Sequence, residues 1–218
     1  SRGAEPMLTL VGADRLQEIA VEHEGATALV FTETREFPIR RARGLPTRWL
    51  PQLETSRVTF SGEARPGEFY VFQIGVYGLK QTGPLALTFA DLSGATETIP
   101  SSALRCLSLG GVDHLGRGFT KQIAVGPGQL QALWVGVDVP DGARGAFSGT
   151  AKLRLAPDQT VPIGVTLRVD GPAVSDRGDA VARNLSRLRW LDSTVGSEPT
   201  PTEPFSAVQA RDRVIQIL

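Results

Sequence analysis

The sequence predicts an all-β fold, an antiparallel β-sandwich with one C-terminal helix and a proline-rich linker. Two observations support this fold class. Segments rich in apolar, β-branched and aromatic residues recur between residues 58 and 169, and this composition favours strands over helices. Turn-forming residues separate these segments, and the 218-residue chain contains 24 glycines and 15 prolines. Strands spaced in this way are typical of a sandwich or a barrel.

The expected strands follow one another along the chain. Three of them fall in the first fifty residues, before a basic segment at 40–49 that we interpret as a solvated connector. The longest run is EFYVFQIGVY at 68–77, and because almost every position is apolar, both of its faces should be covered. The complete set of expected strands is 7–11, 16–21, 27–31, 58–60, 68–77, 85–89, 104–109, 122–125, 131–139, 151–155 and 163–169.

The C-terminal part departs from the strand pattern. Residues 180–192 predict one helix, because apolar side chains recur near one face at helical spacing and arginines occupy the rest. Residues 196–204 are rich in proline, which predicts an extended linker without a packed core. We therefore expect three regions: N-terminal strands with a basic connector at 1–50, the sandwich core at 51–172, and the helix, linker and start of a following module at 173–218.

Charge and composition exclude several classes of protein. The 23 basic and 23 acidic residues cancel, so the chain offers no bulk field for nucleic acid or an anionic membrane. No unbroken apolar run approaches the ~20 residues of a membrane helix. One cysteine, Cys106, excludes an intrachain disulfide and a thiolate-rich zinc site, and we expect neither a metal nor a cofactor. No secretory signal is visible, so the chain is either cytoplasmic or secreted with its leader removed.

No segment supplies the groups of a catalytic centre. The acidic residues lie mainly in expected turns, whereas a glycosidase needs two carboxyl groups about 5–10 Å apart on rigid elements. Cys106 lies in an apolar run, which predicts a buried thiol. Neither a Gly-x-Ser-x-Gly sequence nor a phosphate-binding glycine pattern occurs. The sequence therefore predicts no catalytic residue.

Glycan binding is an alternative, because sugar faces stack on exposed aromatic rings. The candidates are Tyr70 and Tyr77, together with Asp113 and His114 of the glycine-rich loop at 110–118. Asp113 and His114 could bind a sugar hydroxyl or a metal ion. A turn stabilised by the Asp113 carboxylate is the other interpretation of this loop.

Three segments, taken together, resemble the N-terminal region of glycoside hydrolase family 123 and its bacterial relatives. They are PGEFYVFQIGVY at 66–77, QALWVGVDVP at 131–140 and SRLRWLDSTVG at 186–196, followed by Pro204 and Phe205. The resemblance implies a β-sandwich that precedes a (β/α)₈ barrel. It also implies hydrolysis of β-linked N-acetylgalactosamine, with the acetamido group of the substrate as nucleophile and an adjacent Asp-Glu pair of the barrel assisting. No position of this chain matches that pair.

The leading hypothesis is a non-catalytic β-sandwich module of a bacterial glycoside hydrolase, which braces a (β/α)₈ domain absent from this chain. The predicted interface comprises Arg187, Arg189 and Asp192 as ion-pairing residues and Trp190 as the apolar anchor, since a helix with one apolar face can bridge two bodies. A carbohydrate-binding module is the first alternative. A subunit that pairs with a separately encoded catalytic chain is the second.

Overall fold

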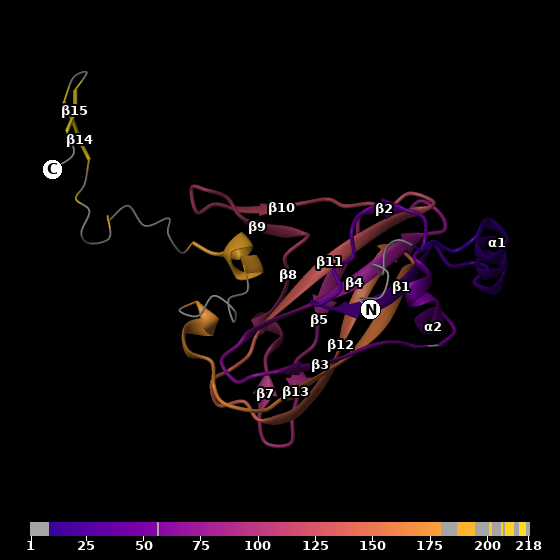
Figure 1. Cartoon of the computed structure of the whole chain (residues 1–218), viewed down its shortest axis with the longest axis horizontal. Coiled ribbons are helices and arrows are strands. Elements are labelled where there is room, and N and C mark those ends of the chain that lie inside the picture. The colour runs from indigo at the N-terminus through magenta and orange to yellow at the C-terminus, as the bar shows by residue number, and fades with distance from the viewer. Residues whose placement is uncertain are drawn as a thin grey trace.

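The computed structural model describes residues 9–55, 57–179, 187–194, 201, 206, 208–211 and 214–216. Within these residues, strands of two sheets pack against one another around a common apolar core (Figure 1). The predicted all-β sandwich is therefore confirmed.

The first sheet is built around β4 (Phe69–Gly78), the long apolar run. β4 pairs antiparallel with β1 (Ala28–Thr34) on one side and with β11 (Gln129–Asp138) on the other. β11 also pairs with the short strands β2 (Ala42–Arg43) and β8 (Leu104–Cys106). Every residue of β4 is buried, as the continuous apolar pattern predicted.

The second sheet is built on the hairpin of β12 (Gly145–Ala156) and β13 (Gln159–Val169). β12 also pairs with β5 (Ala86–Phe89) and β6 (Leu92–Ser93), and β6 pairs with β7 (Thr98–Ile99). β3 (Val58–Ala64) lies beside β13 in parallel orientation. This pair departs from the expected antiparallel order, because the long chain between β3 and β13 allows both strands to run the same way.

The core between the sheets contains Phe60 and Phe72, whose rings stack with centroids 4.1 Å apart. A second apolar cluster lies on the outer face of the first sheet, where Trp49 stacks on Phe31 at 4.7 Å. Trp49 belongs to the basic segment, in η1 (Thr47–Trp49), which continues into α2 (Leu50–Leu53). The expectation of a solvated connector is therefore wrong at this point, because the segment covers the outer face of β1 and β4.

Three of the expected strands are also wrong. In the described part of 7–11, residues 9–11, Leu10 forms only an isolated bridge with Pro46. Residues 16–21 lie in α1 (Ala13–Glu22), because Leu16 and Ile19 stand at helical spacing and Ile19 is the buried residue of the helix. Residues 122–125 form no strand, although the carbonyls of Ile123 and Val125 accept hydrogen bonds from Leu85 and Thr82. The backbone there is extended but lacks the regular series of hydrogen bonds that defines a strand. This explains why its sequence resembles that of a strand.

The remaining elements are short. They are η2 (Ser101–Ala103), the hairpin strands β9 (Gly110–Val112) and β10 (Gly118–Thr120), η3 (Ser175–Gly178), η4 (Arg187–Asp192), and the hairpin strands β14 (Gln209–Arg211) and β15 (Val214–Gln216). The described part of the predicted helix, η4, is a 3₁₀ helix, and residues 180–186 lie outside the described residues. Most of the predicted linker at 196–204 also lies outside them.

Candidate functional site

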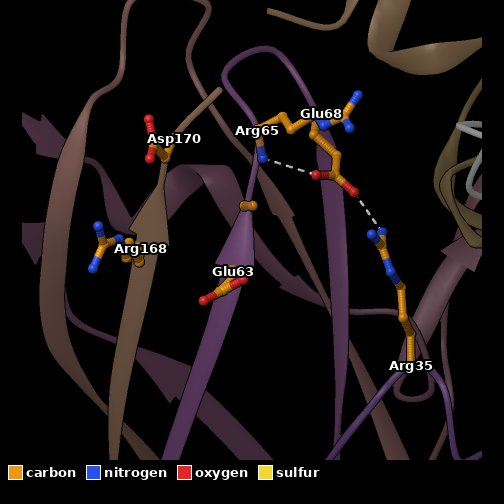
Figure 2. A pocket seen from close by; sticks show the side chains of 7 residues that line it. Arg35, Glu63, Arg65, Glu68, Arg168 and Asp170 are labelled. Atoms are coloured by element: carbon orange, nitrogen blue, oxygen red, sulfur yellow. Dashed lines mark hydrogen bonds and ion pairs between the residues drawn. The ribbon is translucent and has the colours of Figure 1, made fainter. Parts of the chain in front are cut away.

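A charged pocket of about 550 Å³ lies where the turn after β1, the turn between β3 and β4 and the end of β13 meet (Figure 2). Three arginines and three acidic residues line it, with one alanine. These lining residues are Arg35, Glu63, Ala64, Arg65, Glu68, Arg168 and Asp170. We call this site the charged pocket.

The parallel pairing of β3 with β13 builds one wall of the charged pocket. It places Arg168 opposite Glu63, and both residues are exposed because they alternate with buried neighbours on their strands. The turn that follows β3 passes through Gly67 at a φ of +72°. A Cβ at Gly67 would lie 2.6 Å from the Val174 carbonyl oxygen, so only glycine fits this turn.

Glu68 forms the fixed part of the pocket and is only 7 % exposed. One carboxylate oxygen accepts a hydrogen bond from the backbone N–H of Arg65 at 2.9 Å, and the other accepts one from the Arg35 guanidinium at 2.5 Å (Figure 2). Arg35 also lies over the ring of Tyr70, 5.2 Å from its centroid. Both oxygens of Glu68 are thus engaged, and the residue positions Arg35 and the turn.

The other side of the pocket is not internally paired. Among the described residues, no hydrogen bond or ion pair engages the guanidinium of Arg65, the guanidinium of Arg168 or the carboxylate of Glu63. Figure 2 shows Glu63 and Arg168 extending from neighbouring strands, with Asp170 above them. The Arg65 side chain runs past Glu68, away from Glu63 and Arg168 (Figure 2). The side formed by Glu63 and Arg168 therefore keeps one donor group and one acceptor group for a bound molecule.

Tyr70 and Tyr77, predicted to stack on sugar, lie in the core with exposed fractions of 4 % and 5 %. Burial raises the pKa of Tyr70 to about 12 and also raises the pKa of Tyr77. The two rings stand seven residues apart on β4, about 23 Å along the strand. Neither ring offers a free face, and only Tyr70 lies near the charged pocket, beneath Arg35.

Asp113 and His114 occupy the loop between β9 and β10. Oδ1 of Asp113 accepts the backbone N–H groups of Leu115 and Arg117 at 2.8 and 3.0 Å, and Oδ2 accepts from the Arg117 side chain. These bonds from Arg117 hold the pKa of Asp113 below its usual range. The structure thus supports the interpretation of Asp113 as a turn-stabilising residue, while His114 is exposed.

The predicted interface residues lie in η4, beside β9 (Figure 1). Arg189 forms an ion pair with Asp179. A Cβ at Gly111 would lie 2.6 Å from the Leu191 carbonyl oxygen, so the η4 backbone rests directly on β9. The side chains of Arg187 and Asp192 lie outside the described part of the structure.

Four large apolar side chains are exposed on η4 and the β9–β10 hairpin. Trp190 and Leu191 are 44 % and 53 % exposed, and Leu115 and Phe119 are exposed on the hairpin. We call these four residues the apolar exit surface. The sequence pattern predicted Trp190, whereas the two hairpin residues were missed because Leu115 lies in a polar loop and Phe119 lies in the three-residue strand β10.

The chain that leaves β13 is fastened to the end of the sandwich by Arg177. Its guanidinium pairs with Asp138 at 2.9 Å and Asp141 at 2.8 Å, and donates to the Val139 carbonyl at 3.0 Å. Asp176 and Arg177 have φ values of +49° and +55°. Such backbone is unfavourable for residues other than glycine, so the contacts of Arg177 are needed to stabilise it. They thereby fix the direction in which the chain leaves the sandwich.

The described residues offer neither a metal-binding cluster nor a reactive thiol. No group of three or more His, Cys, Asp or Glu side chains lies close enough there to hold a metal ion. Burial raises the pKa of the Cys106 thiol to about 11, which keeps it protonated at neutral pH. No helix in this part of the chain has the length and apolar character needed to cross a membrane.

Comparison with known proteins shows a likeness of fold. No family model and no curated protein matches the sequence. The chain is similar to a family 123 glycoside hydrolase from Clostridium perfringens, described for glycolipid glycan hydrolysis, with a TM-score of 0.50 and 12 % identity. The match covers 68 % of this chain and 28 % of that chain. It shows a fold relationship, in agreement with the β-sandwich that the sequence resemblance implied.

Two further solved structures are similar at lower scores. A GH5 xyloglucanase from Bacteroides ovatus, in complex with a XXXG heptasaccharide, matches at a TM-score of 0.29 and 12 % identity over 54 % of this chain and 18 % of its own. A non-cellulosomal cohesin from Archaeoglobus fulgidus matches at 0.30 and 10 % identity over 67 % of this chain and 93 % of its own. Similarity at this level assigns no relationship.

Proposed function

We propose that this chain is a non-catalytic β-sandwich module of a bacterial glycoside hydrolase that braces a (β/α)₈ catalytic domain in the same or a partner chain. The observation that supports the proposal most is the fold shared with a family 123 glycoside hydrolase. This chain spans 28 % of that enzyme, the size expected of one module. The three sequence segments that resemble the family's N-terminal region support the same proposal.

The apolar exit surface is the place where this module would contact the catalytic domain. Exposed apolar groups that cluster on one face mark interaction sites, and tryptophan and phenylalanine are enriched at the centres of protein interfaces. Trp190 and Phe119 supply such groups here. The ion pair of Arg189 with Asp179 would hold η4 in place while the interface forms.

Two of the described carboxylates, those of Glu68 and Asp113, fit a supporting role. The carboxylate oxygens of Glu68 accept hydrogen bonds from the Arg65 backbone in the same turn and from the Arg35 side chain that follows β1. Those of Asp113 accept hydrogen bonds within their own loop. A general acid or base needs a free carboxyl group within reach of substrate. These two carboxylates act instead as structural acceptors.

Purification of the protein from its native host tests the proposal. We expect a (β/α)₈ glycosidase to accompany the module, either in frame or as a second polypeptide. We also expect the isolated module to show no turnover of aryl β-N-acetylgalactosaminides. Measurable hydrolysis by the pure module, or its isolation as a lone monomer, would contradict the proposal.

A further inference from the structure

We propose that the charged pocket is a binding site for a sugar unit that carries a carboxylate, such as a uronic acid residue of an acidic glycan. The site belongs to the module itself and requires no catalytic domain. It is independent of the residues that the sequence suggested for glycan binding.

The pocket is pre-organised on one side. Glu68 is buried, and its two oxygens hold Arg35 and the turn at Arg65. Arg35 is further held against the ring of Tyr70. A volume of about 550 Å³ is within the range of small-molecule sites, so a sugar ring can enter without rearrangement of this wall.

The opposite side offers free charges that ordinary packing would pair. Arg168 and Glu63 are register partners on neighbouring strands, which lie about 4.8 Å apart. Opposite charges at such positions normally attract one another, yet these two side chains form no ion pair. Both therefore keep their hydrogen-bonding capacity for a ligand.

These free groups define the chemistry of the ligand. A guanidinium binds a carboxylate through two parallel hydrogen bonds. The carboxylate of Glu63 can accept hydrogen bonds from sugar hydroxyls, as can Oδ2 of Asp170, whose Oδ1 already accepts the Gly171 backbone N–H at 2.7 Å. The three acidic lining residues balance the three arginines, which disfavours a ligand with several negative charges. No aromatic residue lines the pocket, so a neutral sugar finds no ring to stack on. A hydroxylated ligand with one carboxylate satisfies all of these conditions.

Isothermal titration of the whole chain at low salt tests this site. The probes are glucuronate, galacturonate and N-acetylneuraminate, with galacturonate methyl ester as the matched uncharged sugar and inorganic phosphate as a simple anion. We expect saturable binding of at least one acidic sugar and none of the ester. Binding should weaken as salt is added, because exposed charges are screened.

Substitutions then locate the binding. Arg168→Gln should weaken binding of the acidic sugar about tenfold or more, the effect of losing a charged hydrogen bond, and Arg168→Lys should fall between. Arg154→Gln is the matched control, because Arg154 is an exposed arginine on β12, eight residues from the register partner of Arg168. Thermal melting confirms that each variant is folded.

Three results would overturn the proposal. They are the absence of binding by all three acids, equal binding by Arg168→Gln and the control, and phosphate binding as tight as that of the acids. None of these results bears on the proposed bracing role, since the titration uses the module alone. Conversely, a module that braces no catalytic domain can still bind the acidic sugar.

Discussion

Arg168 and Glu63 are direct partners in the parallel pairing of β13 with β3, yet their side chains form no ion pair. Their backbones are paired in the sheet, and neither charge is neutralised by the other. If these two charges were paired with each other, neither side chain would be free to bind a ligand. The pocket around them has a volume of about 550 Å³, which is within the range of small-molecule sites.

The outer core depends on the buried carboxylate of Glu33. It accepts hydrogen bonds from the Trp49 indole at 2.9 Å, the Arg48 guanidinium at 2.8 Å and the Thr34 backbone at 2.8 Å. Glu33→Ala should lower the free energy of unfolding by about 2–4 kcal/mol, because it strands buried donors. Urea denaturation measures the change, and the exposed Glu24→Ala is the control. A loss equal to that of the control would show that these bonds add nothing.

Tyr70 should destabilise the fold at alkaline pH. Burial raises its pKa to about 12, whereas an unfolded tyrosine ionises near 10. The unfolded state therefore loses its proton first, and stability should fall as the pH rises from about 10 to about 12. Tyr70→Phe should remove part of this fall in denaturation series at pH 9 and pH 11. Equal losses in Tyr70→Phe and wild type would contradict the assignment.

Arg177 should hold the segment at 170–179, which follows β13, against the end of the sandwich. Its ion pairs with Asp138 and Asp141 are partly exposed, so each contributes little alone. Arg177→Ala should nevertheless speed amide exchange at Val174, whose N–H binds the Pro66 carbonyl at 2.8 Å, by roughly fivefold for about 1 kcal/mol. Hydrogen exchange of the segment at 170–179 measures this, with Arg154→Ala as control. Unchanged exchange would show that Arg177 does not hold this segment in place.

Gly111 should set the position of η4. Gly111→Ala places a methyl group 2.6 Å from the Leu191 carbonyl oxygen, whereas Gly118→Ala in the same hairpin meets nothing within 4 Å. We expect faster hydrogen exchange over residues 187–192 in the first variant and wild-type exchange in the second. The same exchange in both variants would mean that η4 does not rest on β9 in solution.

Features that depend on a local sequence pattern were predictable from the sequence. The run at 68–77 predicted a central strand covered on both faces, and β4 is that strand. Residues 16–21 were misassigned, because a short apolar pattern fits either period until packing selects Ile19. The burial of Tyr77 was missed because its cover, including Trp49, comes from the segment interpreted as a solvated connector.

The charged pocket lay beyond prediction from the sequence. Glu63 and Arg168 are separated by more than a hundred residues, and only the parallel pairing of β3 with β13 brings them together. The single local signal was the turn at 64–67, followed at once by an acidic residue. A turn of this kind indicates a change of direction and does not identify a pocket.

Cross-linking mass spectrometry of the protein purified from its host tests the bracing role most directly. We expect cross-links from the β9–β10 hairpin and the residues around Trp190 to an identified (β/α)₈ glycosidase domain. These cross-links should be lost in the variant with both Phe119→Ser and Trp190→Ser. Lys121, next to β10, provides a reactive amine close to this surface. Cross-links that avoid the apolar exit surface, or that persist unchanged in the double variant, would contradict the proposed bracing role.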